Sequence, residues 1–149
     1  WASPKEDAEL IQRNVEWLEK AQVAEGKSRG AWSYAVTNGG RGDGSCSRFG
    51  VLGLDAAKRA GFKVNDETWK RVSDYWLTAQ KENGAWGYTP ESGPTLTMTL
   101  AGVAGLATAN RHLPNDDQTK TREAAMRTPI SRAARTSASI SACVPLGKT

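Results

Sequence analysis

The chain has 149 residues, of which 38% are hydrophobic and 24% are charged, and its formal net charge is +4. This composition fits one ordinary globular domain and excludes a second large one. The sequence has no run of the roughly 18 to 20 apolar residues that a membrane-spanning helix needs, and its start lacks a signal-peptide pattern, so we expect no transmembrane segment.

The excess positive charge lies near the end of the chain. Four of the 20 lysine and arginine residues follow Glu123, and no acidic residue does, so the other 16 balance the 16 acidic side chains. The body of the chain therefore lacks the basic surface that binds a phosphate backbone, and we expect no nucleic-acid partner.

The first predicted element is an amphipathic helix. Ser3–Glu6 has a capping-box pattern, with a hydroxyl at the N-cap, proline at the first helical position and glutamate three residues on. Apolar residues follow at alternating steps of three and four, at Ala8, Ile11, Val15 and Leu18. This spacing predicts one apolar stripe that faces the core.

Four more helices follow, each with its own start or stop signal. The second is predicted over 47–60, where Gly61 ends it in a left-handed conformation, and the third starts at 65–67. The fourth starts at Thr97 or Thr99 and ends at Asn110, and the fifth covers 116–126. No stretch alternates like a half-buried strand, apart from a few residues near the tryptophan loops, so the predicted class is all-α. The expected inner face of the third helix consists of Trp69, Val72, Trp76 and Ala79.

One sequence phrase occurs twice. The segment 17–34 recurs at 75–88, and each copy leads to a small-residue helix, at 50–54 and 102–106. The offset between copies falls from 58 to 54 and then 52 residues, because the linkers differ in length. Such internal repetition is typical of helical repeat proteins. The motif residues are Gln22, Gly30 and Trp32 in the first copy and Gln80, Gly84 and Trp86 in the second.

We predict a structural role for this motif. The glutamine amide can donate and accept, so it can satisfy carbonyls at its own helix end and amides of the next helix, while the indole covers the junction. Burying a tryptophan removes about 150 to 250 Å² from water, which stabilises the unit by at most about 4 to 6 kcal/mol.

The repeat resembles the prenyltransferase and squalene-oxidase repeat of squalene-hopene cyclases and their relatives, over roughly residues 5 to 127. Gln80 to Trp86 matches its Gln-Trp signature with a shortened gap, and Gln22 to Trp32 matches with a lengthened one. The segment 43–54 is similar to bacterial proteins built from such repeats. The resemblance implies an α/α toroid, with repeat units at about 5–61 and 65–113 and a third helix pair that starts at 116–127.

The expected toroid is incomplete. About two and a half hairpins cannot close a ring, and the chain starts with Trp1, so we expect a piece of a longer protein. Residues 128–149 form a basic tail rich in Ser, Ala and Arg, with too few large apolar side chains to pack, and are predicted to be disordered. A truncation or a change of reading frame would explain this shift in composition.

No catalytic group is identified from the sequence. The resemblance implies an Asp-x-Asp-Asp acid in the cyclases, but the nearest text here, Asn115–Asp117, is expected to cap a helix. Zinc-binding relatives use Asp, Cys and His, yet Asp43 and Cys46 are three residues apart instead of two, and His112 lies at the wrong end of its helix. The thioester motif of complement-like relatives is absent. We therefore expect no metal and no cofactor, and free thiols at Cys46 and Cys143.

These features favour a binding or scaffold module without catalysis of its own. The remainder of a longer toroid, or another protein, is expected to cover the open inner face, where the ligand would be apolar or a peptide. The alternative is part of a terpenoid cyclase whose acidic motif lies elsewhere. The candidate functional residues are Asp43 and Ser45, which precede or open an inner helix whose backbone amides can hold an anion, although both can equally cap that helix.

Overall fold

A computed structural model describes residues 7–35 and 41–142, with side chains as far as residue 129. This part of the chain contains helices and no named strand, which confirms the all-α class. Trp32 and Asp43 form an isolated antiparallel bridge. The elements are α1 (Ala8–Ala21), the 3-10 turn η1 (Gly26–Ser28), α2 (Gly44–Arg59), α3 (Asp66–Ala79), α4 (Leu96–His112) and α5 (Asp117–Ala142).

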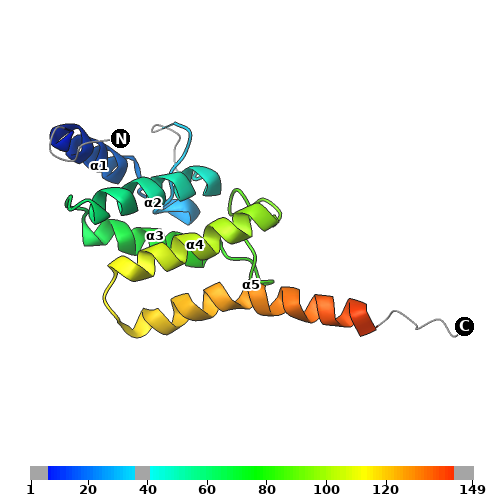
Figure 1. Cartoon of the computed structure of the whole chain (residues 1–149). Helices are drawn as coiled ribbons and strands as arrows, with labels where there is room; N and C mark the ends of the chain where they lie inside the picture. Colours follow the sequence, from blue (N-terminus) through cyan, green and yellow to red (C-terminus); the bar gives the residue numbers. More distant parts are fainter. Residues whose placement is uncertain (1–6, 36–40, 143–149) are drawn as a thin grey trace, which may run out of the picture.

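The helices pack in chain order as two hairpins and one further helix. α1 pairs with α2, and α3 pairs with α4 (Figure 1). α2 lies against α4, and α5 packs along α4 and also contacts α3. Among the described helices, none is both long and apolar enough to cross a membrane.

Side-chain caps set the starts of α2 and α4. The Asp43 carboxylate accepts a hydrogen bond from the Cys46 amide at 2.9 Å, so α2 starts three residues earlier than predicted. The Thr95 hydroxyl accepts from the Met98 amide at 3.2 Å, so α4 starts just before the predicted Thr97. At the other end of α2, Gly61 has φ +93°, which confirms the predicted left-handed residue.

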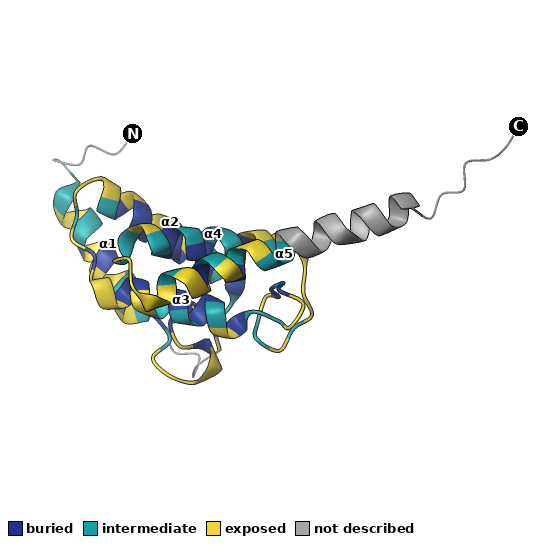
Figure 2. Ribbon diagram, turned by 90° about the horizontal axis from the view of Figure 1, so that it is seen from below, coloured by how far each residue is buried: buried dark blue, intermediate teal, exposed yellow. Residues whose placement is uncertain are grey.

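The third helix agrees with its prediction. Asn65 caps it by accepting from the Glu67 amide at 3.0 Å. Its apolar stripe forms the centre of the core, where Figure 2 shows dark-blue residues between the packed helices. The predicted inner-face residues Trp69, Val72, Trp76 and Ala79 are all buried.

The two terminal helices differ from the predictions. α1 starts at Ala8 after Asp7, and the capping-box segment 3–6 lies outside the described residues. α5 continues to Ala142, past the predicted end at 126, and contains Pro129. Alanine and arginine are strong helix formers, which explains why this composition can extend a helix. α5 thus includes 128–142 of the segment 128–149 that was expected to be disordered, while the side chains of 130–142 and all of 143–149, with Cys143, lie outside the described residues.

Candidate functional site

Each motif tryptophan is anchored by the helix before it. The Trp32 indole N–H donates to the Leu18 carbonyl at 2.8 Å, and the Trp86 indole N–H donates to the Trp76 carbonyl at 2.7 Å. Leu18 and Trp76 are 58 residues apart, which is the repeat offset for this helix. The two indoles therefore have equivalent surroundings, and both side chains are buried.

A glycine on the following helix lets each indole approach closely. A Cβ added to Gly50 would lie 2.7 Å from Cδ2 of Trp32. A Cβ on Gly102, which is the equivalent residue 52 positions later, would overlap the Trp86 ring. The small-residue helices noted in the sequence are thus required by the indoles that lie on them.

The motif glutamines join neighbouring units. Nε2 of Gln22 donates to the carbonyls of Gly30 at 3.1 Å and Thr68, on α3, at 3.3 Å. Nε2 of Gln80 likewise donates to Gly84 at 2.9 Å and to Ala125, on α5, at 2.9 Å. The predicted partners were wrong in detail, because the acceptors are a loop carbonyl and a carbonyl of the next unit, not groups at the end of the same helix.

Pro129 explains one of these acceptors. Proline has no N–H, so the carbonyl four residues earlier, that of Ala125, lacks its usual helical donor. Gln80 supplies a donor to this carbonyl. The Gln80 side chain thus allows a proline inside α5 without leaving the Ala125 carbonyl unsatisfied.

The motif glycines complete each junction. Gly30 has φ +90° and Gly84 has φ +82°, a backbone conformation that favours glycine. A Cβ on Gly30 would overlap the Arg71 carbonyl, and one on Gly84 would lie 2.6 Å from Cγ2 of Thr128. Both glycines therefore touch the first helix of the next unit, and the second contact lies just past the predicted boundary at residue 127.

The two candidate functional residues cap α2. The Asp43 carboxylate accepts from the Cys46 amide and from the Ser45 hydroxyl, and the Asp43 amide donates to the Trp32 carbonyl at 2.8 Å. The Ser45 hydroxyl also lies 3.4 Å from that of Tyr34. The backbone amides at the start of α2 were considered as an anion site, but one of them, that of Cys46, already donates to the Asp43 carboxylate.

The possible zinc ligands are not brought together. Asp43 and Cys46 lie at the start of α2, whereas His112 lies at the end of α4 beside Asp55. Nine residues, about 13 Å of helix, separate Cys46 from Asp55. Burial, followed by the neighbouring Asp43, raises the pKa of the Cys46 thiol, which disfavours the reactive thiolate. In the described part of the chain, no group of three His, Cys, Asp or Glu side chains could hold a metal ion.

Sequence reasoning missed a polar cluster between α2 and α4. Asp55 is buried and lies 2.8 Å from Nε2 of His112 and 3.3 Å from Nη2 of Arg111. The His112 ring stacks on Trp69 with 4.2 Å between centroids. Burial acts to raise the pKa of Asp55, but the hydrogen bonds from His112 and Arg111 outweigh it and hold this pKa below its ordinary value. An aspartate inside the otherwise small and apolar segment 50–57 is the signal that could have indicated this cluster.

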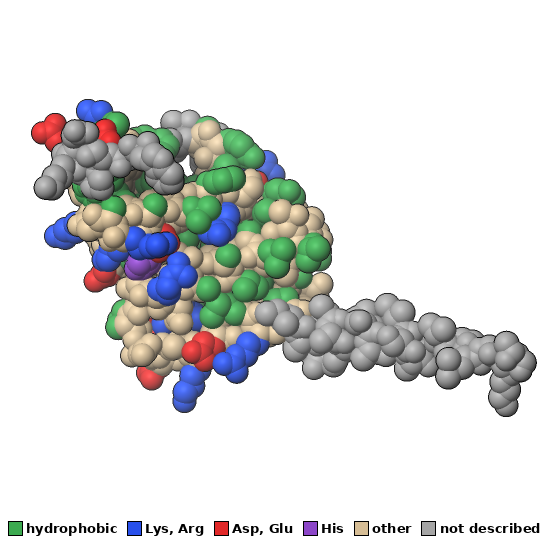
Figure 3. All heavy atoms as spheres, viewed as in Figure 1, with side chains coloured by type: hydrophobic (Ala, Val, Ile, Leu, Met, Phe, Trp, Pro, Cys, Tyr) green, Lys and Arg blue, Asp and Glu red, His purple; other side chains and the backbone are tan. Residues whose placement is uncertain are grey.

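Exposed apolar side chains lie on α2 and α4. Figure 3 shows hydrophobic groups gathered toward one end of these helices, whereas the histidine and several basic side chains lie toward the other. The exposed residues are Phe49 and Leu52 on α2 and Leu96 and Leu100 on α4. We call Leu52, Leu96 and Leu100 the inner-helix face.

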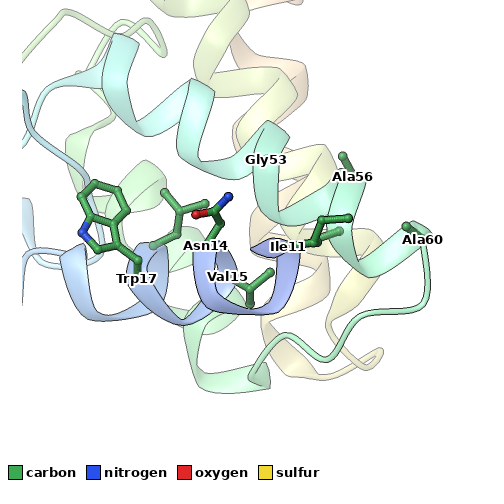
Figure 4. Close-up of a pocket in the computed structure, with 9 residues that line it drawn as sticks. Ile11, Asn14, Val15, Trp17, Gly53, Ala56 and Ala60 are labelled. Carbon is green, nitrogen blue, oxygen red and sulfur yellow. The ribbon is translucent and has the colours of Figure 1, made fainter. Parts of the chain in front are cut away.

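A groove runs between α1 and α2. It has a volume of about 630 Å³ and is lined mainly by apolar side chains of both helices (Figure 4). It continues into a hollow of about 390 Å³ beside Trp32 and Phe49. The residues that define this α1–α2 groove are Ile11, Asn14, Trp17, Gly53, Ala56 and Ala60.

No protein-family model matches this sequence, and no solved structure matches the chain significantly. The resemblance to squalene-cyclase repeats therefore depends on the repeated motif alone.

Proposed function

We propose that this chain is a binding or scaffold module built of squalene-cyclase-like helical repeats, without catalytic activity of its own. The observation that carries this proposal is the repeated corner. In both copies an indole binds the preceding helix and a glutamine amide binds the next unit. The motif side chains are thus engaged in joining repeats, which is a structural task.

The best polar candidates also have structural partners. Asp43 caps α2, and Asp55 binds His112 and Arg111 across α2 and α4. Asp116, in the stretch nearest to the cyclase acid motif, accepts from the Gln118 amide and from Arg122 at 3.0 Å each. These contacts favour the cap and ion-pair roles of the carboxylates over a role as a proton donor.

The ligand class follows from the inner-helix face. Leu100 is 62% exposed on α4, and Leu52 and Leu96 are exposed with it. Large apolar side chains that are exposed to solvent are typical of a binding surface. We therefore propose an apolar or peptide ligand for this face, covered further by another protein or by more repeats.

Dye binding tests the proposed face. Anilinonaphthalene sulfonate is titrated into the wild type, Leu100→Glu and the matched control Leu10→Glu, whose leucine is 48% exposed on α1. Leu100→Glu should weaken dye binding several-fold, and Leu10→Glu should leave it unchanged. Equal effects of both variants, or none, would contradict the proposal.

A second assay separates the module from the alternative of a cyclase part. The purified protein is incubated with squalene, and the extract is analysed by gas chromatography and mass spectrometry. We expect only unchanged squalene. Detection of any cyclised product would contradict the proposed lack of catalytic activity and would favour the alternative, a part of a terpenoid cyclase.

A further inference from the structure

The two repeat units bury equivalent positions to very different extents. Tyr75 on α3 is 2% exposed, but Trp17, 58 residues earlier on α1, is 56% exposed. Ala101 on α4 is 7% exposed, but Phe49, 52 residues earlier on α2, is 73% exposed. The same surface of the repeat is therefore covered in the second unit and exposed in the first.

α2 is the element that covers this surface in the second unit. The Gly44 amide donates to the Tyr88 carbonyl at 2.6 Å, and a Cβ on Gly44 would lie 3.2 Å from Sδ of Met98. Further along α2, Ser47 interacts with the Tyr75 hydroxyl. α2 therefore packs along α4 and reaches α3 at Tyr75.

An ion pair marks the far end of this interface. Asp55 of α2 binds Arg111 of α4. The residue equivalent to Arg111 in the first unit is Arg59, 52 positions earlier, which is exposed and forms no ion pair with another described residue. Suppose that a helix packs on the first unit in the way that α2 packs on the second. A carboxylate at its position equivalent to Asp55 would then lie beside Arg59.

The α1–α2 groove has room for such a helix. Gly105 of the second unit lies against Trp76, whereas the equivalent Gly53 is exposed and has only Leu18 nearby, with its added Cβ 3.5 Å from Cδ1. Leu18 occupies the position that Trp76 occupies in the second unit, and the groove beside Leu18 has a volume of about 630 Å³.

We propose that the α1–α2 groove binds an amphipathic α-helix of a partner protein, with an apolar face like that of α2 and a carboxylate near its C-terminal end that pairs with Arg59. This inference deepens the proposed binding function and rests on it, but it concerns a different surface from the inner-helix face. The pattern to match is Gly44, Ser47, Val51, Leu54 and Asp55 of α2.

A second copy of this chain is the less suitable occupant. The helix it would offer is α4, but α5 already packs along α4, where Asn110 accepts from Nε of Arg122 at 2.8 Å. The α2-like face of that helix is therefore partly occupied within its own chain.

A peptide with the α2 sequence, residues 43–61 with Cys46→Ser, is the probe. Its binding to the full chain is measured by fluorescence anisotropy of an N-terminal label. The test variant is Ala56→Lys, which places a charge in the groove, and the control is Ala124→Lys at an exposed site on α5. Ala56→Lys should weaken binding by about tenfold or more, because the charge must be desolvated, and Ala124→Lys should change it less than twofold.

A charge exchange tests the orientation of the helix. Arg59→Glu should weaken binding about two- to fivefold, as expected for an exposed ion pair, and a peptide with Asp55→Lys should restore it. The matched control is Arg13→Glu, whose exposed side chain does not line the groove. Thermal melts of all four variants verify that the fold is retained.

Three outcomes would overturn the inference. The wild type does not bind the peptide, or binding is insensitive to Ala56→Lys, as it would be if the peptide displaced α2 from its own site. The third is dimerisation of the chain that Ala56→Lys abolishes, which would make the groove a self-interface. The effect of Leu100→Glu on dye binding reports on the inner-helix face, and the effect of Ala56→Lys on peptide binding reports on the groove, so the two proposals can fail separately.

Discussion

The backbone carbonyl of Trp76 accepts the indole N–H of Trp86 at 2.7 Å, and the two rings meet edge to face with 6.4 Å between centroids. A carbonyl near the end of α3 is thus satisfied by the loop that follows it. The same bond joins Trp32 to Leu18, where no second indole is present. The repeated element is therefore the backbone hydrogen bond, and the aromatic pair belongs to the second unit.

Gly102→Ala should destabilise the protein. Its Cβ would overlap the Trp86 ring, which is held in place by its indole hydrogen bond. Overpacking of this kind costs about 1 to 3 kcal/mol. Urea denaturation followed by circular dichroism measures the change in the free energy of unfolding.

Gly53→Ala is the matched control for Gly102→Ala. It also lies inside a helix, but its Cβ would lie 3.5 Å from Leu18, which is ordinary contact. Replacing a helical glycine with alanine should stabilise the chain by about 0.5 to 1 kcal/mol. Equal effects in the two variants would refute the close packing of Trp86 on Gly102.

Gln80 and Pro129 should be energetically coupled. Gln80→Met leaves the Ala125 carbonyl without a donor and should lower the free energy of unfolding by about 1 to 3 kcal/mol. In a Pro129→Ala background the alanine N–H can donate to this carbonyl, so Gln80→Met should cost less. A double-mutant cycle by urea denaturation should give a coupling of at least about 0.5 kcal/mol.

Gln118→Met is the control for that cycle. Gln118 is exposed near the start of α5, and its replacement should change stability by less than about 0.5 kcal/mol. Strict additivity of Gln80→Met and Pro129→Ala would show that the glutamine does not compensate for the proline.

Asp55 should make stability depend on acid pH. Its pKa is lowered in the folded state by His112 and Arg111 against the opposing effect of burial, so its contribution is present above the ordinary aspartate pKa of about 4. As pH falls further, through the folded-state pKa, this contribution is lost. Asp55→Asn should therefore be less stable than the wild type at neutral pH, by about 1 to 3 kcal/mol, and the difference should shrink below pH 4.

The control for Asp55 is Glu82→Gln, an exposed carboxylate in the loop after α3. Denaturation curves at a series of pH values should show the shrinking difference for Asp55→Asn alone. A difference that persists at low pH would assign the effect to packing and not to the charge.

Tyr75 should make stability depend on alkaline pH. Burial, with smaller effects of Asp43 and Glu91 against the Ser47 hydrogen bond, raises its pKa to about 12. Since the unfolded chain loses this proton near pH 10, the Tyr75 contribution is complete below pH 10 and is lost between pH 10 and 12. Tyr75→Phe should flatten this loss in urea titrations at fixed pH. Tyr34→Phe, at an 83% exposed residue, should keep it.

Local signals in the sequence predicted the helices well. The period of Trp69, Val72 and Trp76 identified α3 and its buried face, and Gly61 marked the end of α2. The starts of α2 and α4 were placed late because Asp43 and Thr95, and not the residues after them, are the N-caps.

Contacts between distant residues were harder to foresee. The pairing of Asp55 with His112 spans 57 residues and depends on how α2 and α4 lie side by side, which helical periodicity does not specify. The exposure of Trp17 was equally hidden, since its equivalent Tyr75 is buried. The pairing of Asp55 with His112 defines the polar cluster, and the exposed Trp17 lines the groove. Neither surface could therefore be proposed from the sequence without the three-dimensional structure.

The contact of Gly84 with Thr128 and Pro129 matters for how shorter versions of this protein are made. A truncated protein that ends at Arg127, where the amino-acid composition changes, would lack Thr128 and Pro129. The turn at Gly84 would then be exposed to solvent. Its purified product should be more easily cleaved by proteases around residues 81–85 than one that retains Pro129.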